Sequence, residues 1–382
     1  MKRKLKFSKS VKIFFIAEFL QNFARTLPHA ILVIYMLSKG LDLKEIAFVQ
    51  SIFMLTSTIF EFPSGVVADY FLRKSIYLVS IATIFVSYLL IGFFTDNLVI
   101  LSFGYFLYGL SSALKTGTVE SDIVLDYRNK NLDIKDFSVF YSYVENFSAI
   151  LGGLIGGFLY KYFYDKIYIF SIVFFALSFI VSIFIQINLK DKEVIKRTTL
   201  RKELTSASFI IKDNLNLKRI IILYMISMFF IQPFYQYWQV AYKEINLDVK
   251  YFGIIYIIFQ GCNIVGSFIY SKVSFKNMYK LIIGLIPIVM IFNFYNNYFI
   301  LFTLPIAVIL FFIYERYLDV YCKRNSPEKY MSSFISLVGT VCRLSSIVSM
   351  FLMASLINYV GVFVGYFIMF LLFFIFSVIC IK

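Results

Sequence analysis

Apolar runs, each long enough to cross a membrane, recur along the whole chain and constrain its fold more than any other feature. A helix needs about 20 apolar residues to span the hydrocarbon core of a bilayer. The chain is 60% hydrophobic, whereas soluble domains are about 45–50% apolar. A soluble fold of this chain could not bury so much apolar surface. Counted between polar breaks, the runs predict an all-α integral membrane protein with twelve transmembrane helices, at residues 11–37, 43–69, 75–95, 97–121, 136–160, 167–189, 219–242, 250–271, 278–293, 297–320, 329–357 and 359–381.

The basic residues support this count. With twelve helices both termini lie on one side, and the segments on that side carry 27 of the 37 Lys and Arg residues, against six on the other side. Cytoplasmic loops carry the excess of basic residues in membrane proteins. We therefore expect both termini in the cytoplasm and two six-helix bundles, at residues 1–189 and 219–382, joined by a cytoplasmic loop at 190–218.

Several classes of function are excluded by what the chain lacks. The four cysteines form no C-x-x-C pair and there is one histidine, so we expect no metal site, no disulfide framework and no cofactor. No Walker A sequence occurs, so the chain does not hydrolyse ATP itself. A lipid-modifying membrane enzyme would need clustered metal-binding acids or a nucleophile and base on one membrane face, and none is visible, so we predict no enzyme.

The loop after the second predicted span carries the pattern G-x-x-x-D-x-x-x-R-K, with Gly65, Asp69, Arg73 and Lys74. With the six-plus-six arrangement and the basic central loop, this pattern resembles the major facilitator superfamily. The run F-E-F-P-S-G before the loop resembles the bacterial drug-efflux-like branch of that family. Leu72 stands where the family usually has a second glycine. The resemblance implies a bacterial inner or plasma membrane location.

In the family this loop lies at the cytoplasmic gate. Gly65 would allow two helix backbones to approach closely, and Asp69 would accept backbone N–H groups from the helix that begins near Lys329. Arg73 would pair with Asp69 or with another acid of the same half; alternatively, Asp69 and Arg73 merely flank the membrane ends. Glu61 is either a hydrogen-bonded anchor or a group that titrates during transport. The predicted gate set also includes Lys74, Glu120 and Glu315, and Asp122, Arg316 and Asp319 are expected in the same gating networks.

A polar stripe in the first span is the first candidate for contacts with substrate and protons. Glu18, Asn22, Arg25 and His29 follow one another at steps of four, three and four residues, which places them on one face of a helix. Glu18 and Arg25 can pair across Asn22, and the alternative reading is a neutralised packing stripe. The resemblance adds further polar residues to a substrate path, although each can also serve as an ordinary interhelical hydrogen bonder: Lys115, Glu145, Asn146, Gln236, Gln260, Asn263 and Arg343.

Two further patterns concern packing. Gly152, Gly153, Gly156 and Gly157 form overlapping G-x-x-x-G patterns, which predict close helix packing. Trp238, near the outer end of the seventh span, is expected in an interfacial aromatic belt or, alternatively, in a cation–π site.

The sequence thus predicts a secondary transporter that alternates access to its two sides. We expect proton coupling through Glu18 or Glu145, efflux of a small amphipathic molecule, and a monomer in the lipid bilayer without nucleic-acid partners. The alternatives are a nutrient importer of the same fold and a transporter-like sensor or immunity protein without flux.

Overall fold

The computed structural model describes residues 7–70, 72–115, 118–130, 134–186, 215–272, 279–325 and 331–381, and all regular elements among them are helices. Within these ranges, side chains are not described at residues 62, 65–70, 128–129, 134–136, 138–139, 165, 220, 271, 279–280, 319–325, 331–337 and 381. The α-helices are α1 (Lys9–Thr26), α2 (Leu32–Ser38), α3 (Leu43–Tyr70), α4 (Arg73–Phe93), α5 (Leu98–Lys115), α6 (Val119–Asn129), α7 (Ile134–Phe163), α8 (Ile167–Ile183), α10 (Leu215–Glu244), α11 (Phe252–Lys272), α12 (Tyr279–Ile291), α13 (Ile300–Asn325), α14 (Met331–Val360) and α15 (Val362–Ile381). Single turns of 3-10 helix are η1 (His29–Ile31), η2 (Tyr164–Lys166), η3 (Val249–Tyr251), η4 (Phe292–Phe294) and η5 (Asn297–Phe299).

Helices occupy every predicted span. By length and composition, eight helices among the described residues are able to cross a membrane, and two shorter apolar helices lie at Ile167–Ile183 and Leu281–Phe294. The chain is therefore a multi-pass helical membrane protein, and the count of twelve crossings stays a prediction.

Two predicted spans are not continuous helices. In the first, α1 ends at Thr26, and a turn of 3-10 helix at η1 precedes α2. The break follows from Pro28, because proline has no N–H to donate to the carbonyl four residues earlier and its ring clashes with that carbonyl. In the fourth, α5 ends at Lys115 and α6 begins at Val119.

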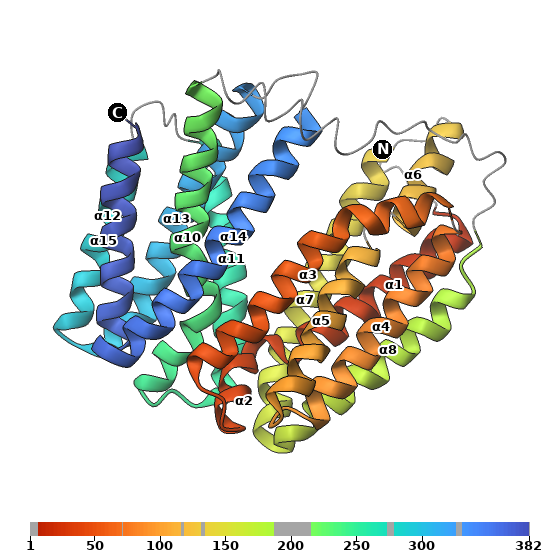
Figure 1. The fold of residues 1–382 in the computed structure, drawn as a ribbon, viewed down its shortest axis with the longest axis horizontal. Coiled ribbons are helices and arrows are strands. Elements are labelled where there is room, and N and C mark those ends of the chain that lie inside the picture. The colour runs from red at the N-terminus through yellow and green to blue at the C-terminus, as the bar shows by residue number, and fades with distance from the viewer. Residues whose placement is uncertain are drawn as a thin grey trace. The chain divides into compact units, whose positions relative to one another are not determined.

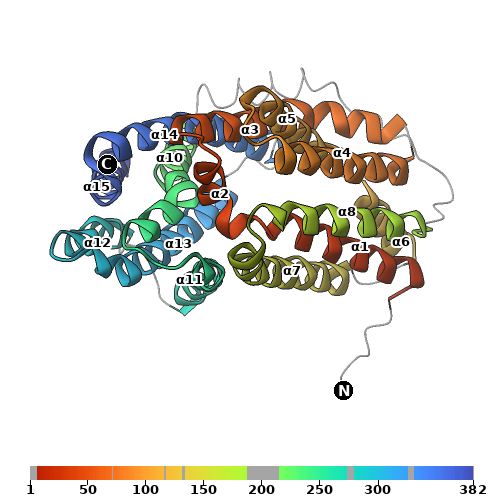
Figure 2. The ribbon, with the colours of Figure 1, turned by 90° about the horizontal axis from the view of Figure 1, so that it is seen from below.

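The chain divides into two compact units. Unit 1 comprises Met1–Ile195 and Val249–Tyr256, and unit 2 comprises Lys196–Asp248 and Ile257–Lys382. In unit 1, α1 packs against α7 and α8, while α4 packs against α5 and α8 and α3 packs against α5 (Figure 1). Figure 2 shows α1 with α8 on one side and α7 on the other, so the first helix of the chain is packed between these two helices.

Small residues bring α1 and α7 together in unit 1. A Cβ added at Gly152 would collide with the Thr26 side chain, and one at Gly156 would collide with the backbone carbonyl of Leu27. Close approach of two helices requires small residues at the contact. The G-x-x-x-G prediction of close helix packing is confirmed for this pair of glycines.

Unit 2 is built around α10, which packs against α13, α14 and α15, while α12 packs against α13 and α15 (Figure 2). Its α14 and α15 are joined at Gly361, whose φ of +82° is the left-handed conformation that glycine adopts most easily. Trp238 of α10 is buried at 4% exposure, with its ring 5.4 Å from Phe259 and 6.1 Å from Tyr242. The prediction of an interfacial belt for Trp238 is wrong, because the ring is buried in an aromatic core; the cation–π alternative stays a prediction.

Candidate functional site

A buried carboxylate on α1 is the centre of the polar interior of unit 1. Glu18 has no solvent exposure, and its Oε2 accepts a hydrogen bond from the Lys115 ammonium on α5 at 2.7 Å. The Tyr77 hydroxyl on α4 donates to Oε1 at 2.8 Å. The Tyr141 hydroxyl on α7 donates to Oε2 at 3.1 Å. Four helices of the unit therefore converge on one carboxylate.

Aromatic rings enclose this ion pair on the side of the Glu18 carboxylate. The Phe14 ring centre lies 6.1 Å from that of Tyr77 and 5.6 Å from that of Tyr141, and Phe137 stacks on Tyr141 at 6.0 Å. Charges attract each other more strongly in such surroundings than in water, and a charge within a membrane segment normally has a partner. The geometry ties the charge of Glu18 closely to that of Lys115.

Two further carboxylates act on the same region. Glu120 on α6 interacts electrostatically with Glu145 on α7, with Glu18 and with Lys115. Glu120 is exposed and Glu145 is half-buried. Among the described residues no group of His, Cys, Asp and Glu is arranged to hold a metal ion.

The predicted stripe on the first span separates into two environments. Glu18 and Asn22 are buried, whereas the side chains of Arg25 and His29 are exposed. Asn22 Nδ2 is a buried donor without a hydrogen-bond acceptor among the described residues. Glu18 pairs with Lys115, so the predicted pairing of Glu18 with Arg25 is wrong. The backbone carbonyl of Arg25 instead accepts a hydrogen bond from the Tyr88 hydroxyl at 3.0 Å.

The remaining candidate of unit 1 makes a local contact. Asn146 is exposed, and its Nδ2 donates to the Ser142 carbonyl of its own helix at 2.8 Å. This bond does not connect helices.

Part of the predicted gate lies within the described side chains. Arg73, the first residue of α4, pairs with Asp122 of α6 at 2.8 Å, so its partner is another acid of the same half. Lys74 Nζ donates to the Ile183 carbonyl at 2.6 Å. Glu61 is exposed on α3. The side chains of Asp69 and Asp319, the surroundings of Gly65, and Lys329 as a whole lie outside what the structure describes.

The candidates of unit 2 lie on α10, α11, α13 and α14. Gln236 is buried, and its Nε2 has no hydrogen-bond partner among the described residues. Gln260 is half-buried, as are Glu315 and Arg343, which both interact with other groups. Asn263 Oδ1 accepts a hydrogen bond from Arg316 at 3.0 Å. The structure thus connects a predicted substrate-path residue to a residue that was expected in the gating network.

A family model described as Major Facilitator Superfamily matches residues 14–350. The chain belongs to this superfamily. It is therefore a membrane transporter by family rather than an enzyme, and a transporter fold implies a small-molecule substrate and a membrane.

Solved structures of low sequence identity share the fold of this superfamily member. The nucleoside transporter NupG has a TM-score of 0.78 at 14% identity, covering 98% of this chain and 97% of NupG. A bacterial homologue of the iron transporter ferroportin in an inward-facing state has 0.76 at 12% identity, covering 98% of this chain and 99% of the other. A POT family transporter in complex with 5-aminolevulinic acid has a TM-score of 0.73 at 14% identity, and the match covers 100% of this chain and 97% of that transporter. A comparison with curated proteins found no match.

Sequence reasoning missed three residues that the facilitator fold brings into these networks. Tyr77 and Tyr141 donate to Glu18, and Ser267 accepts from Arg316 at 2.9 Å. A buried carboxylate needs donors, so tyrosines within spans were the signal. That signal is weak here because the chain holds 29 tyrosines.

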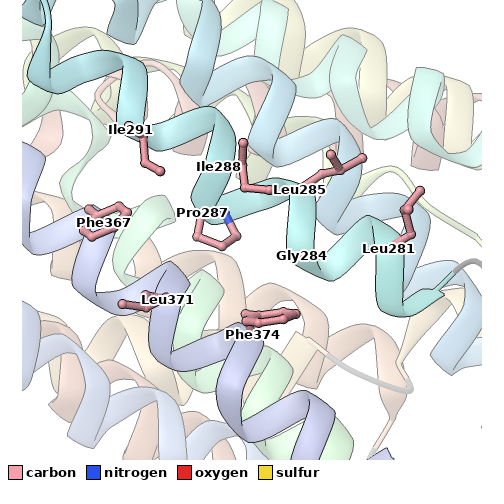
Figure 3. A pocket seen from close by; sticks show the side chains of 9 residues that line it. All are labelled: Leu281, Gly284, Leu285, Pro287, Ile288, Ile291, Phe367, Leu371 and Phe374. Carbon is pink, nitrogen blue, oxygen red and sulfur yellow. The ribbon is translucent and has the colours of Figure 1, made fainter.

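An apolar groove between α12 and α15 does not suit a polar substrate. Its volume is about 410 Å³, and its walls hold no charged or hydrogen-bonding side chain (Figure 3). The lining residues are Leu281, Gly284, Leu285, Pro287, Ile288, Ile291, Phe367, Leu371 and Phe374.

Proposed function

We propose that this superfamily member is a secondary active transporter that moves a small amphipathic molecule by alternating access, with proton-coupled efflux as its activity. It crosses the bacterial inner or plasma membrane twelve times with both termini in the cytoplasm. The excess of basic residues in the segments assigned to the cytoplasm supports this topology. The family supports alternation between two states.

The observation that carries proton coupling is the burial of Glu18 against Lys115. A proton on Glu18 removes one of the two charges and ends their attraction, leaving Lys115 with no counter-charge at 2.7 Å. Two conformations that differ in this contact would therefore be populated differently by protonated and ionised protein. Glu120 and Glu145 lie close enough to act on the same charges, so they are secondary candidates for the proton path.

The gate residues have a separate role in this proposal. The ion pair of Arg73 and Asp122 joins α4 to α6. Gly65 and Asp69 lie on α3, the helix that precedes α4. We propose that the residues at this cytoplasmic end make contacts that form only when the transporter is closed on its cytoplasmic side. The proposed set comprises Glu61, Gly65, Asp69, Arg73, Lys74, Glu120, Glu315 and Lys329.

Import is the second candidate direction. The structures of similar fold include a nucleoside transporter and POT family transporters. Efflux rests on the drug-efflux-like pattern around Glu61 and Gly65. A sensor or immunity role without flux is the remaining alternative.

The test is proton movement in proteoliposomes. An internal pH-sensitive dye is followed while nucleosides, dipeptides or ethidium are added on either side, which reports coupling and direction together. We expect Glu18→Gln to abolish the substrate-dependent pH change, and Asp96→Asn, at an exposed loop carboxylate, to leave it intact. A Glu18→Gln protein that still couples flux to protons at the wild-type ratio would rule out Glu18 as the coupling group. Binding without flux would favour the sensor.

A further inference from the structure

Arg316 of α13 is a cation with neutral partners inside an apolar helix. It lies in the candidate span Asn297–Leu318. Its Nε donates to Ser267 Oγ at 2.9 Å and its Nη2 donates to Asn263 Oδ1 at 3.0 Å, both on α11. No Asp or Glu among the described residues pairs with it. A charge in a membrane segment normally faces a counter-charge or a functional cavity.

The hydrogen bonds leave one edge of the guanidinium open. Ser267 and Asn263 occupy the side formed by Nε and one N–H of Nη2, so Nη1 and the second N–H of Nη2 make no bond to described residues. A guanidinium offers five N–H donors in a rigid plane. Two adjacent donors of this kind match the two oxygens of a carboxylate or phosphate group. Arg316 is half-buried, so part of its side chain is accessible.

Helix packing holds the guanidinium in this orientation. Asn263 and Ser267 are four residues apart and therefore lie on the same face of α11. Between them, Gly266 brings α11 against α13, since a Cβ at this position would lie 2.8 Å from Phe312 Cβ and 3.1 Å from the Ile309 carbonyl. Arg316 lies one helical turn after Phe312. The close approach of the two helices therefore brings its side chain within hydrogen-bond distance of Asn263 and Ser267.

Each unit holds a half-buried cation on one of its helices, and the two cations have different partners. Lys115 of unit 1 has Glu18 as its counter-charge at 2.7 Å. Arg316 has the oxygens of an amide and a hydroxyl, which orient the guanidinium without neutralising it. Among the described side chains no carboxylate provides a counter-charge to Arg316.

We propose that Arg316, positioned by Asn263 and Ser267, binds the carboxylate or phosphate group of an anionic ligand. Calling that ligand the transported substrate rests on the proposed function; the binding itself does not. The amphipathic substrate of the proposed function would then be anionic or zwitterionic. A lipid phosphate offers the same chemistry, and the experiment separates the two sources.

The experiment measures thermal stability of the full-length protein in phosphatidylcholine nanodiscs against increasing inorganic phosphate or glutarate. A ligand that binds the folded state raises the unfolding temperature according to its concentration relative to Kd. We expect Arg316→Gln to raise the anion concentration needed for the same stabilisation at least tenfold, because the charge and the paired N–H donors are both lost. Lys243→Gln, at an exposed lysine, removes the same charge and should respond like wild type. It also corrects for general salt stabilisation.

Further variants keep the test decisive. Arg316→Lys retains the charge and loses the fork, and Ser267→Ala retains the guanidinium with one acceptor fewer, so both should bind more weakly than wild type. The unfolding temperature is also measured in phosphatidylglycerol nanodiscs without added anion. If it rises only in that lipid, and not in Arg316→Gln, the bound anion is a lipid headgroup. Equal responses of wild type and Arg316→Gln to every anion and lipid overturn the proposal. The nanodisc experiment measures binding and needs no proton gradient. A negative result in the proteoliposome transport experiment would therefore refute the proposed function but not the binding of an anion at Arg316.

Discussion

Removing the charge of Glu18 tests the central ion pair of unit 1 directly. In Glu18→Gln the amide oxygen can still accept from Tyr77, but the attraction to the Lys115 ammonium is lost. In Lys115→Met the carboxylate stays buried without a cation, which should cost more. The double variant removes both charges and should be more stable than Lys115→Met alone, because no buried charge remains unpaired.

The size of the effect follows from the three hydrogen bonds to the carboxylate. The bond from Lys115 at 2.7 Å is charge-assisted and contributes about 1.5–3 kcal/mol. The Tyr77 bond becomes neutral, and the Tyr141 hydroxyl faces the amide NH2 group instead of an oxygen. At about 1 kcal/mol for each of these changes, the total is roughly 3–5 kcal/mol, within the range for breaking a buried pair. For a domain of the size of unit 1, 1 kcal/mol corresponds to about 2–4 °C. We expect the midpoint to fall by about 6–20 °C.

The assay is thermal unfolding of the purified protein in detergent, with the four members of the double-mutant cycle measured in parallel. The coupling energy between Glu18 and Lys115 should exceed about 1.5 kcal/mol, since groups in contact depart from additivity by about 0.5–3 kcal/mol. Asp96→Asn serves as the control for loss of a carboxylate in an exposed loop. Effects of the two single variants that add within about 0.5 kcal/mol would refute the view that these residues form a stabilising pair.

Three further predictions concern neighbouring contacts. Tyr77→Phe removes one donor to the carboxylate and should destabilise by about 1.5–3 kcal/mol, seen as a lower unfolding midpoint; an unchanged midpoint would mean that the bond contributes nothing. Gly156→Val places a side chain against the Leu27 carbonyl and should cost at least about 1–3 kcal/mol, with crosslinking of α1 to α7 reporting their separation. Arg73→Gln removes the partly exposed pair with Asp122 and should cost about 1 kcal/mol at low salt; measured at about 1 M salt, where screening is strong, the difference from wild type should shrink, and a constant difference contradicts an ionic origin.

The helical nature of the chain could be predicted because apolar runs of membrane length leave few other structures. In the bilayer every backbone polar group must be satisfied internally, which favours helices. The helical period also placed Glu18 and Asn22 on one face of α1, and the structure shows that both are buried. Periodicity could not predict that Arg25 and His29, at the same spacing, would be exposed, because exposure depends on which helices pack beside each turn.

The partners of buried groups were beyond reach from the sequence. Lys115 follows Glu18 by 97 residues, and only the packing of α5 near α1 makes them neighbours. Arg25, seven residues away on the same helix, was the nearer choice in sequence and is wrong. Trp238 illustrates the same limit, because the sequence does not indicate which rings of other helices, such as Phe259, pack beside it.

The network of Glu18 has a consequence for how the protein is made. The carboxylate belongs to the first helix, whereas its cation is synthesised 97 residues later and the Tyr141 hydroxyl 123 residues later. At about 5–20 residues per second, the ribosome needs roughly 5–20 s to deliver Lys115. During that interval an acidic residue at the centre of a membrane helix costs about 2.5–3.5 kcal/mol on insertion scales. The first helix therefore enters the bilayer poorly by itself, and its final placement waits for α5 and α7 to emerge and receive it.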